Sequence, residues 1–100
     1  MNKYPEVGEM VLQEINRQDS KWGADRLQHP FEWNAILTEE TGEFAQEVLH
    51  NEYGGDHAGT ALKEIIQVAV VAMQIANSIL LEKDVLKDKG LSLLQERNGE

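Results

Sequence analysis

The stretch ILTEETGEFAQEVL, residues 36 to 49, places carboxylates where a helix should bury apolar side chains. At about 100° per residue, Leu37 and Phe44 fall on one face, which predicts an amphipathic helix packed against a core. Glu40 falls within this apolar face, and Glu43 lies beside it one turn further on. Burying an unpaired carboxylate costs several kcal/mol, and two neighbouring carboxylates also repel each other. The pattern therefore predicts a compensating cation.

Hydrophobic periodicity along the rest of the chain predicts helices and no strand. Val7, Val11 and Ile15 recur at every fourth position, which is the spacing of one helix face. Proline is tolerated in the first turn of a helix, so we expect a second helix to begin between Pro30 and Trp33. The expected helices span residues 6 to 18, about 30 to 51 and about 56 to 83, with a loop over residues 19 to 32 and a short fourth helix around residues 91 to 94. We expect residues 1 to 100 to form a single all-α domain, a compact antiparallel helical bundle.

Composition narrows the classes of function. A chain of 100 residues is large enough for one modest core. A net charge of −9 disfavours binding to nucleic acid, which needs clustered Lys and Arg, and favours divalent cations. The absence of cysteine excludes thiolate sites and fits a reducing compartment. The first residues lack an apolar signal core, so we expect a cytoplasmic protein.

The expected third helix is unusually apolar. From Ile65 to Leu81 apolar residues occur nearly all round it, which predicts burial on several sides. Polar residues nevertheless gather on one side, where Glu64, Gln67, Gln74 and Ser78 form a polar seam. Because of these polar residues, we do not expect the helix to span a membrane. Its apolar surface exceeds what the other helices of so small a chain can cover, which predicts a homodimer centred on this helix.

Two of the expected helices carry oxygen-bearing side chains at the same spacing. Glu40 and Glu43 lie three residues apart on one, and Glu64 and Gln67 on the other. Antiparallel packing can bring all four to one point, and such oxygens suit Mg²⁺ or Mn²⁺. A di-iron site would need Glu-x-x-His pairs, which neither helix has. From the residues alone, a metal site and a solvated acidic face both remain open.

The expected loop carries an aromatic and basic set that a simple connector does not need: Lys21, Trp22, Arg26 and His29. Loops hold binding residues more often than cores do. Trp22 can equally close the end of the bundle, and the cations can be solvated surface residues. Both interpretations stay open on the residues alone.

Four short motifs follow one another along the chain. They are KWG at residues 21 to 23, HP at 29 to 30, LTEETGEFA at 37 to 45 and KEIIQVA at 63 to 69. Together they resemble the MazG-like superfamily of all-α nucleoside triphosphate pyrophosphohydrolases, especially its small phage and bacterial members. The resemblance implies a compact four-helix bundle that forms a homodimer or homotetramer. It also implies Mg²⁺-dependent hydrolysis of a nucleoside triphosphate to a monophosphate and pyrophosphate.

The resemblance also implies roles for the acidic residues. The family signature is Glu-Glu-x-x-Glu, followed on the next helix by Glu-x-x-Asp. By similarity, Glu40, Glu43 and Glu64 are direct metal ligands, while Glu39 is a further ligand or orients the attacking water. Gln67 stands where the family has aspartate. Its amide oxygen can bind a hard cation, but the lost charge should weaken metal affinity.

The resemblance further implies a set of residues that bind the substrate: Lys21, Trp22, His29 and Asn77. Asn77 matches a frequent family asparagine, and His29 lies where relatives often have a histidine near the base or sugar. The leading prediction is therefore a Mg²⁺-dependent nucleotide pyrophosphohydrolase of the housecleaning type. A nucleotide-binding or regulatory module that hydrolyses poorly because of Gln67 is the alternative. A purely structural helical protein, with no metal dependence, is the third.

Overall fold

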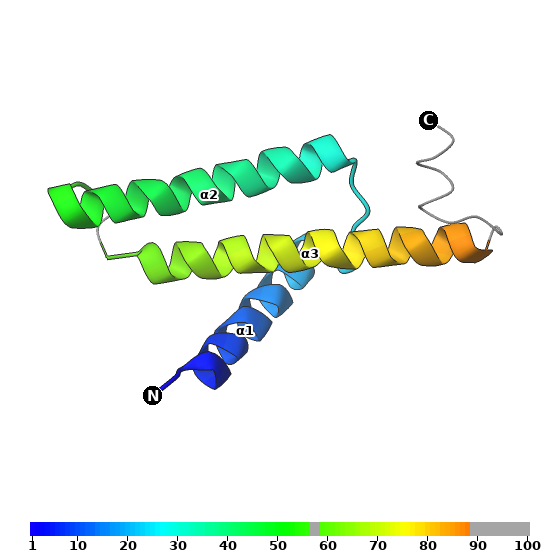
Figure 1. The fold of residues 1–100 in the computed structure, drawn as a ribbon, viewed down its shortest axis with the longest axis horizontal. Coiled ribbons are helices and arrows are strands. Elements are labelled where there is room, and N and C mark those ends of the chain that lie inside the picture. Colours follow the sequence, from blue (N-terminus) through cyan, green and yellow to red (C-terminus); the bar gives the residue numbers. More distant parts are fainter. Residues whose placement is uncertain (57–58, 89–100) are drawn as a thin grey trace.

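The computed structural model describes residues 1 to 56 and 59 to 88, and within them it contains three helices and no strand. Helix α1 spans Tyr4–Trp22, α2 spans Pro30–Tyr53 and α3 spans Ala61–Asp88 (Figure 1). The all-α prediction is confirmed. The short fourth helix that the sequence predicts around residues 91 to 94 lies outside the described residues.

Helix α1 ends at a glycine whose backbone conformation other residues rarely adopt. Gly23 has a φ of 89°, and its N–H donates to the carbonyl of Asp19 at 2.9 Å. The predicted end near residue 18 was wrong, because the helix continues for one more turn to Trp22. Lys21 and Trp22 therefore belong to α1, and the connecting loop shortens to residues 23 to 29.

Helix α2 begins at Pro30, as the sequence predicts. The Nδ1 atom of His29 accepts the backbone N–H of Phe31 at 3.1 Å and so caps the first turn. At the other end the N–H of Gly54, which has a φ of 91°, donates to the carbonyl of His50 at 2.8 Å. The helix is two residues longer than predicted.

Helix α3 is displaced along the chain relative to the prediction. It begins at Ala61, after Thr60, whose carbonyl accepts the N–H of Glu64 at 3.1 Å. The expected start near residue 56 and the expected end near residue 83 were both wrong. The helix continues because Leu86 still lies on its partly buried side and keeps the apolar period beyond the charged residues.

Helices α2 and α3 lie side by side and antiparallel, and α1 crosses α3 at an angle (Figure 1). The buried apolar side chains are Trp33 from α2 and Ile66, Val70 and Val71 from α3, with Val70 fully buried. Helix α1 contributes no buried residue. The core is thus a thin layer, mainly between α2 and α3, and the polar seam of α3 faces the same side.

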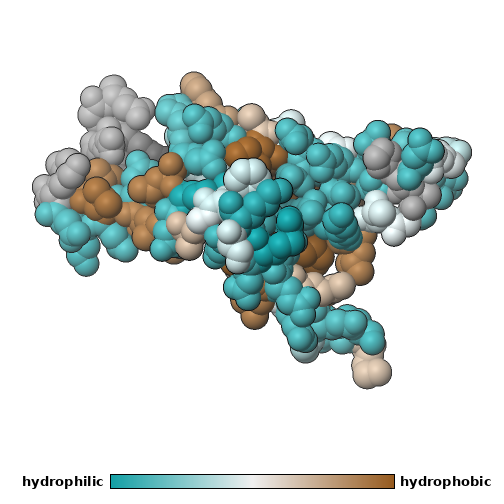
Figure 2. All heavy atoms as spheres, turned by 180° about the vertical axis from the view of Figure 1, so that it is seen from behind, coloured by the Kyte–Doolittle hydropathy of each residue, from teal (hydrophilic) through white to brown (hydrophobic). Residues whose placement is uncertain are grey.

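The opposite side of α3 is not covered by the described part of the chain. Its exposed large side chains include Ile65, Ile79 and Leu80. Apolar surface is visible over the half of α3 that extends beyond α1 (Figure 2). The expectation that α3 is buried on several sides is therefore wrong for the single chain. By length and composition α3 could cross a membrane, with a mean hydropathy of 1.7 over a window of which 22% is buried.

Candidate functional site

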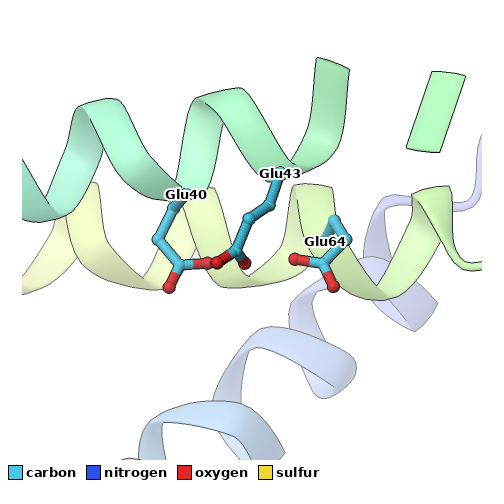
Figure 3. Close-up of side chains that lie close together, drawn as sticks. All are labelled: Glu40, Glu43 and Glu64. Carbon is cyan, nitrogen blue, oxygen red and sulfur yellow. The ribbon is translucent and has the colours of Figure 1, made fainter. Parts of the chain in front are cut away.

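Three carboxylates from two helices meet between α2 and α3. Glu40 and Glu43 come from α2 and Glu64 from α3, and one oxygen of each lies within 4.8 Å of the others (Figure 3). All three side chains are partly buried. The acidic cluster, by which we mean these three residues, is the juxtaposition that the helical spacing predicts.

The cluster concentrates negative charge in a poorly solvated place. Burial, followed by the charges of Glu43 and Glu64, raises the pKa of Glu40. Burial also raises the pKa of Glu64, and a hydrogen bond with Glu43 adds to this effect. The neighbouring carboxylates therefore make ionisation of Glu40 and Glu64 more costly. A proton or a cation in the cluster relieves that cost.

Gln67 of α3 lies within hydrogen-bond distance of two carboxylates of the cluster. With its amide turned so that Nε2 faces the carboxylates, it donates to Glu40 Oε2 at 3.3 Å and to Glu64 Oε2 at 3.0 Å. A half turn of the same amide presents its oxygen to the same place. Gln67 can thus stabilise two carboxylates of the cluster by hydrogen bonds, or add a neutral oxygen ligand to a cation held there.

A cavity of about 410 Å³ extends from the acidic cluster towards α1. Glu40 and Gln67 form its acidic end. Its other wall carries cationic and aromatic side chains: Arg17, Lys21, Trp22 and Arg26. The Lys21 ammonium lies 4.9 Å from the centre of the Trp22 ring. One hollow therefore offers oxygens for a cation at one end and positive charge for an anion at the other.

Arg17 is held in place by an acidic neighbour on α1. Its Nε and Nη2 atoms donate to the two carboxylate oxygens of Glu14 at 2.8 and 2.7 Å, and this pairing lowers the pKa of Glu14. Gln18 also donates to Glu14 at 2.7 Å and accepts from Gln74 of α3 at 2.9 Å. The network connects α1 to α3 beside the site.

The sequence reasoning missed Glu14 and Arg17, although their spacing of three residues on one helix face was a readable signal. It also missed Glu47, which is only 3% exposed and whose charge contributes to the raised pKa of Glu64. Glu47 lies one turn beyond Glu43 on the same face of α2. The helical wheel that identified Glu40 would have identified it too.

The other predicted residues lie at different distances from the cluster. Glu39 is exposed and lies outside the group of three carboxylates whose oxygens meet. Asn77 lines a second cavity of about 280 Å³, which shares Arg26 and Gln74 with the first. His29 lines neither of these cavities. It caps α2 and borders a separate hollow with Ser78.

Comparison of the chain with models of known families, with curated proteins and with solved structures finds no match.

Proposed function

We propose that this protein is a metal-dependent nucleotide pyrophosphohydrolase of the MazG-like type, which cleaves a nucleoside triphosphate to a monophosphate and pyrophosphate. The observation that carries the proposal is the convergence of Glu40, Glu43 and Glu64 beside a cavity whose far wall is cationic. The ligands are hard oxygens, which fit Mg²⁺ or Mn²⁺.

The carboxylates and the basic residues have different proposed roles. Glu40, Glu43 and Glu64 hold the cation, which when bound neutralises phosphate charge and activates water. Arg17, fixed by Glu14, and Lys21 bind phosphate oxygens from the opposite wall. Hydrolysis of a phosphoanhydride depends mainly on positioning and charge neutralisation, so this set suffices.

Three further residues complete the assignment. Glu39 is exposed next to the cluster, so we assign it a contact with the cation through a water molecule rather than a direct one. Trp22 offers an apolar face beside the phosphates. His29, on a separate hollow, is the weakest of the substrate-binding assignments.

The experiment that tests the proposal is a hydrolysis assay on a panel of nucleoside triphosphates, with Mg²⁺, with Mn²⁺ and with a chelator. Both products, the monophosphate and pyrophosphate, are measured. Release of pyrophosphate that requires the metal supports the proposal. Release of inorganic phosphate instead, or no metal-dependent turnover of any nucleotide, rejects it.

Gln67 supports a second candidate, a nucleotide-binding module with little hydrolysis. Its amide satisfies Glu40 and Glu64 without any metal, which an aspartate at this position would not do. We expect Gln67→Asp to lower the metal concentration needed for half-maximal rate about tenfold, because it adds a full charge to the ligand set. If the wild type is inactive and this variant gains activity, the binding module is the correct assignment. A lower melting temperature with no change in metal response would make Gln67 a purely structural residue.

The apolar side of α3 supports a homodimer as the assembled form, with two copies of this helix at its centre. At 100° per residue, Ala69, Ala72 and Ala76 lie along the middle of that side, and larger apolar residues flank them. Small residues let two helices approach closely. A dimer of this kind, or a pair of such dimers, covers the apolar surface that the chain leaves open. It also keeps α3 out of the membrane, and we place the protein in the cytoplasm.

A further inference from the structure

The second cavity adjoins the proposed metal site and has a different character. Its volume is about 280 Å³, and it shares Arg26 and Gln74 with the cavity that contains Glu40. Glu64 and Asn77 are 13 positions apart on α3, a rise of about 20 Å. If the proposed function holds, a nucleotide whose phosphates lie at the acidic cluster extends its base towards this second cavity.

Four of the side chains that border this cavity, Asp19, Asp25, Gln74 and Asn77, carry hydrogen-bond acceptors, and Arg26 adds a cation. Asn77 Nδ2 donates to Asp25 Oδ1 at 3.1 Å, so the amide oxygen of Asn77 and the second oxygen of Asp25 remain as acceptors. Gln74 uses its Nε2 to donate to Gln18, which likewise leaves its oxygen. Asp19 adds a partly buried carboxylate. A ligand edge that donates hydrogen bonds is therefore favoured here.

The remaining walls suit a flat ring. Ile15, Met73 and Trp33 supply apolar surface, and the Arg26 guanidinium lies 5.7 Å from the centre of the Trp33 ring. Trp33 is 4% exposed, and within the described part of the chain its Nε1 has no hydrogen-bond partner. A buried donor of this kind costs free energy unless a partner is supplied.

A hydrogen bond from α3 helps to position the exposed loop residue Asp25. Asp25 adopts a φ of 55°, a left-handed conformation that aspartate tolerates better than most residues. The hydrogen bond from Asn77 holds its carboxylate against α3. Because this acceptor is already positioned, it can discriminate between ligands rather than adapt to them.

We infer that this cavity binds the base of the nucleotide and prefers bases with an exocyclic amino group, cytosine and adenine, over their keto counterparts, uracil and hypoxanthine. The amino group donates to the acceptors at Asp25 and Asn77. A keto oxygen at the same place would face a carboxylate and be repelled. A well-placed pair of hydrogen bonds to a base edge is worth about tenfold in discrimination.

The test uses nucleosides, which carry no phosphate and need no metal. Binding of cytidine against uridine, and of adenosine against inosine, is measured by nuclear magnetic resonance titration in the presence of a chelator. We expect the amino member of each pair to bind about tenfold more tightly. Asp25→Asn, which keeps the shape and tolerates the same φ, should bring the ratio close to one, because its amide can donate to a keto oxygen. Asp84→Asn removes the same charge far along α3 and should leave the ratio unchanged.

The outcomes separate this inference from the proposed function. Equal binding of cytidine and uridine, with a loss for the 2′-deoxy forms, would mean that the acceptors bind ribose hydroxyls and would overturn the base preference. Absence of nucleoside binding would overturn the cavity assignment, whatever the hydrolysis assay gives. Discrimination that disappears in Asp25→Asn supports the inference even if no triphosphate is hydrolysed, in which case only the enzymatic proposal fails.

Discussion

The two sides of α3 depart from ordinary helix patterning in opposite ways. The side that faces α1 and α2 carries Glu64 and Gln67 among buried apolar residues, where a core helix should be apolar. The side that faces away carries exposed residues such as Ile65 and Leu80, where a surface helix should be polar. Each departure costs the isolated chain stability. The proposed cation on the first side, and the proposed second copy of the chain on the other, would each offset that cost.

The largest expected effect is on the charged side. Glu64→Gln keeps the size of the side chain but removes one of the three proposed charged ligands. We expect kcat/KM for the preferred triphosphate to fall at least about 100-fold, because loss of an outer-shell partner alone costs about 10- to 100-fold. Glu52→Gln, an exposed residue of α2 outside the cluster, is the matched control. Equal activity of the two variants would remove Glu64 from the metal site.

The apolar side is tested by Ala72→Glu, at the middle of its row of alanines. Burying an unpaired carboxylate costs several kcal/mol, so a dimer through this face should weaken more than about 100-fold. Sedimentation at micromolar concentration should report a dimer for the wild type and a monomer for the variant. Ala45→Glu makes the same change on the exposed side of α2 and should stay dimeric. A wild type that is monomeric at this concentration would refute the dimer.

The partly buried charges of the acidic cluster should also make the stability of the protein depend on pH. Burial and neighbouring charges raise the pKa values of Glu40 and Glu64, so the folded state holds these protons more tightly than the unfolded state. Their contribution to stability is complete below the ordinary glutamate pKa of about 4.3. It is lost as the pH rises through the raised values. Glu14 acts in the opposite sense, because Arg17 lowers its pKa and its contribution is lost on acidification.

We therefore expect the metal-free protein to melt at a lower temperature at pH 7.5 than near pH 5. The difference should be only a few degrees, because the two glutamates are partly buried and their effect on the free energy of unfolding stays below about 1 kcal/mol. Thermal melts with a chelator across this range measure it. Glu40→Gln should flatten the slope and melt no lower than the wild type at neutral pH, because it relieves repulsion. Added Mg²⁺ should raise the melting temperature most at high pH. A metal-free melting temperature that rises with pH would contradict this account.

The sequence was sufficient to predict these two sides of α3 but not what lies opposite them. The spacing of Glu40, Glu43 and Glu64 depends only on local helix geometry and on two helices being antiparallel, so it could be read directly. The position of Arg17 opposite the cluster depends on how α1 crosses α3. No periodicity encodes a crossing angle, because it is set by packing of all the side chains between the helices.

The bounds of the helices also depend on tertiary contacts that local sequence patterning does not encode. Asp19, Lys21 and Trp22 line cavities rather than a core, so this part of α1 lacks an apolar period and the helix was predicted to end too early. Gly23 was present as a stop signal, but its positive φ becomes decisive only once the helix has reached it. Local patterning thus predicted which elements form, while tertiary contacts set their bounds.

The smallest expected effect concerns Gly42, which lies within the acidic motif on the exposed side of α2. Glycine inside a helix costs up to about 1 kcal/mol relative to alanine. A Cβ there would meet no atom within 4 Å, so Gly42→Ala should raise the melting temperature by a few degrees. Gly55→Ala is the opposing control, because its φ of 148° and the His50 ring leave no room for a side chain. Melts of the two variants should therefore move in opposite directions.

The same Gly42→Ala variant tests whether a ligand or a second copy of the chain requires glycine at this position. The described residues leave open space at this position, so stability alone gives no reason for glycine between Glu40 and Glu43. If the substitution stabilises the protein and hydrolysis is unchanged, Gly42 is a neutral occupant of the motif. If stability rises while the KM for the triphosphate also rises, a ligand approaches the backbone closely at Gly42. A fall in melting temperature would contradict the exposed position and would indicate that a second copy packs on this side of α2.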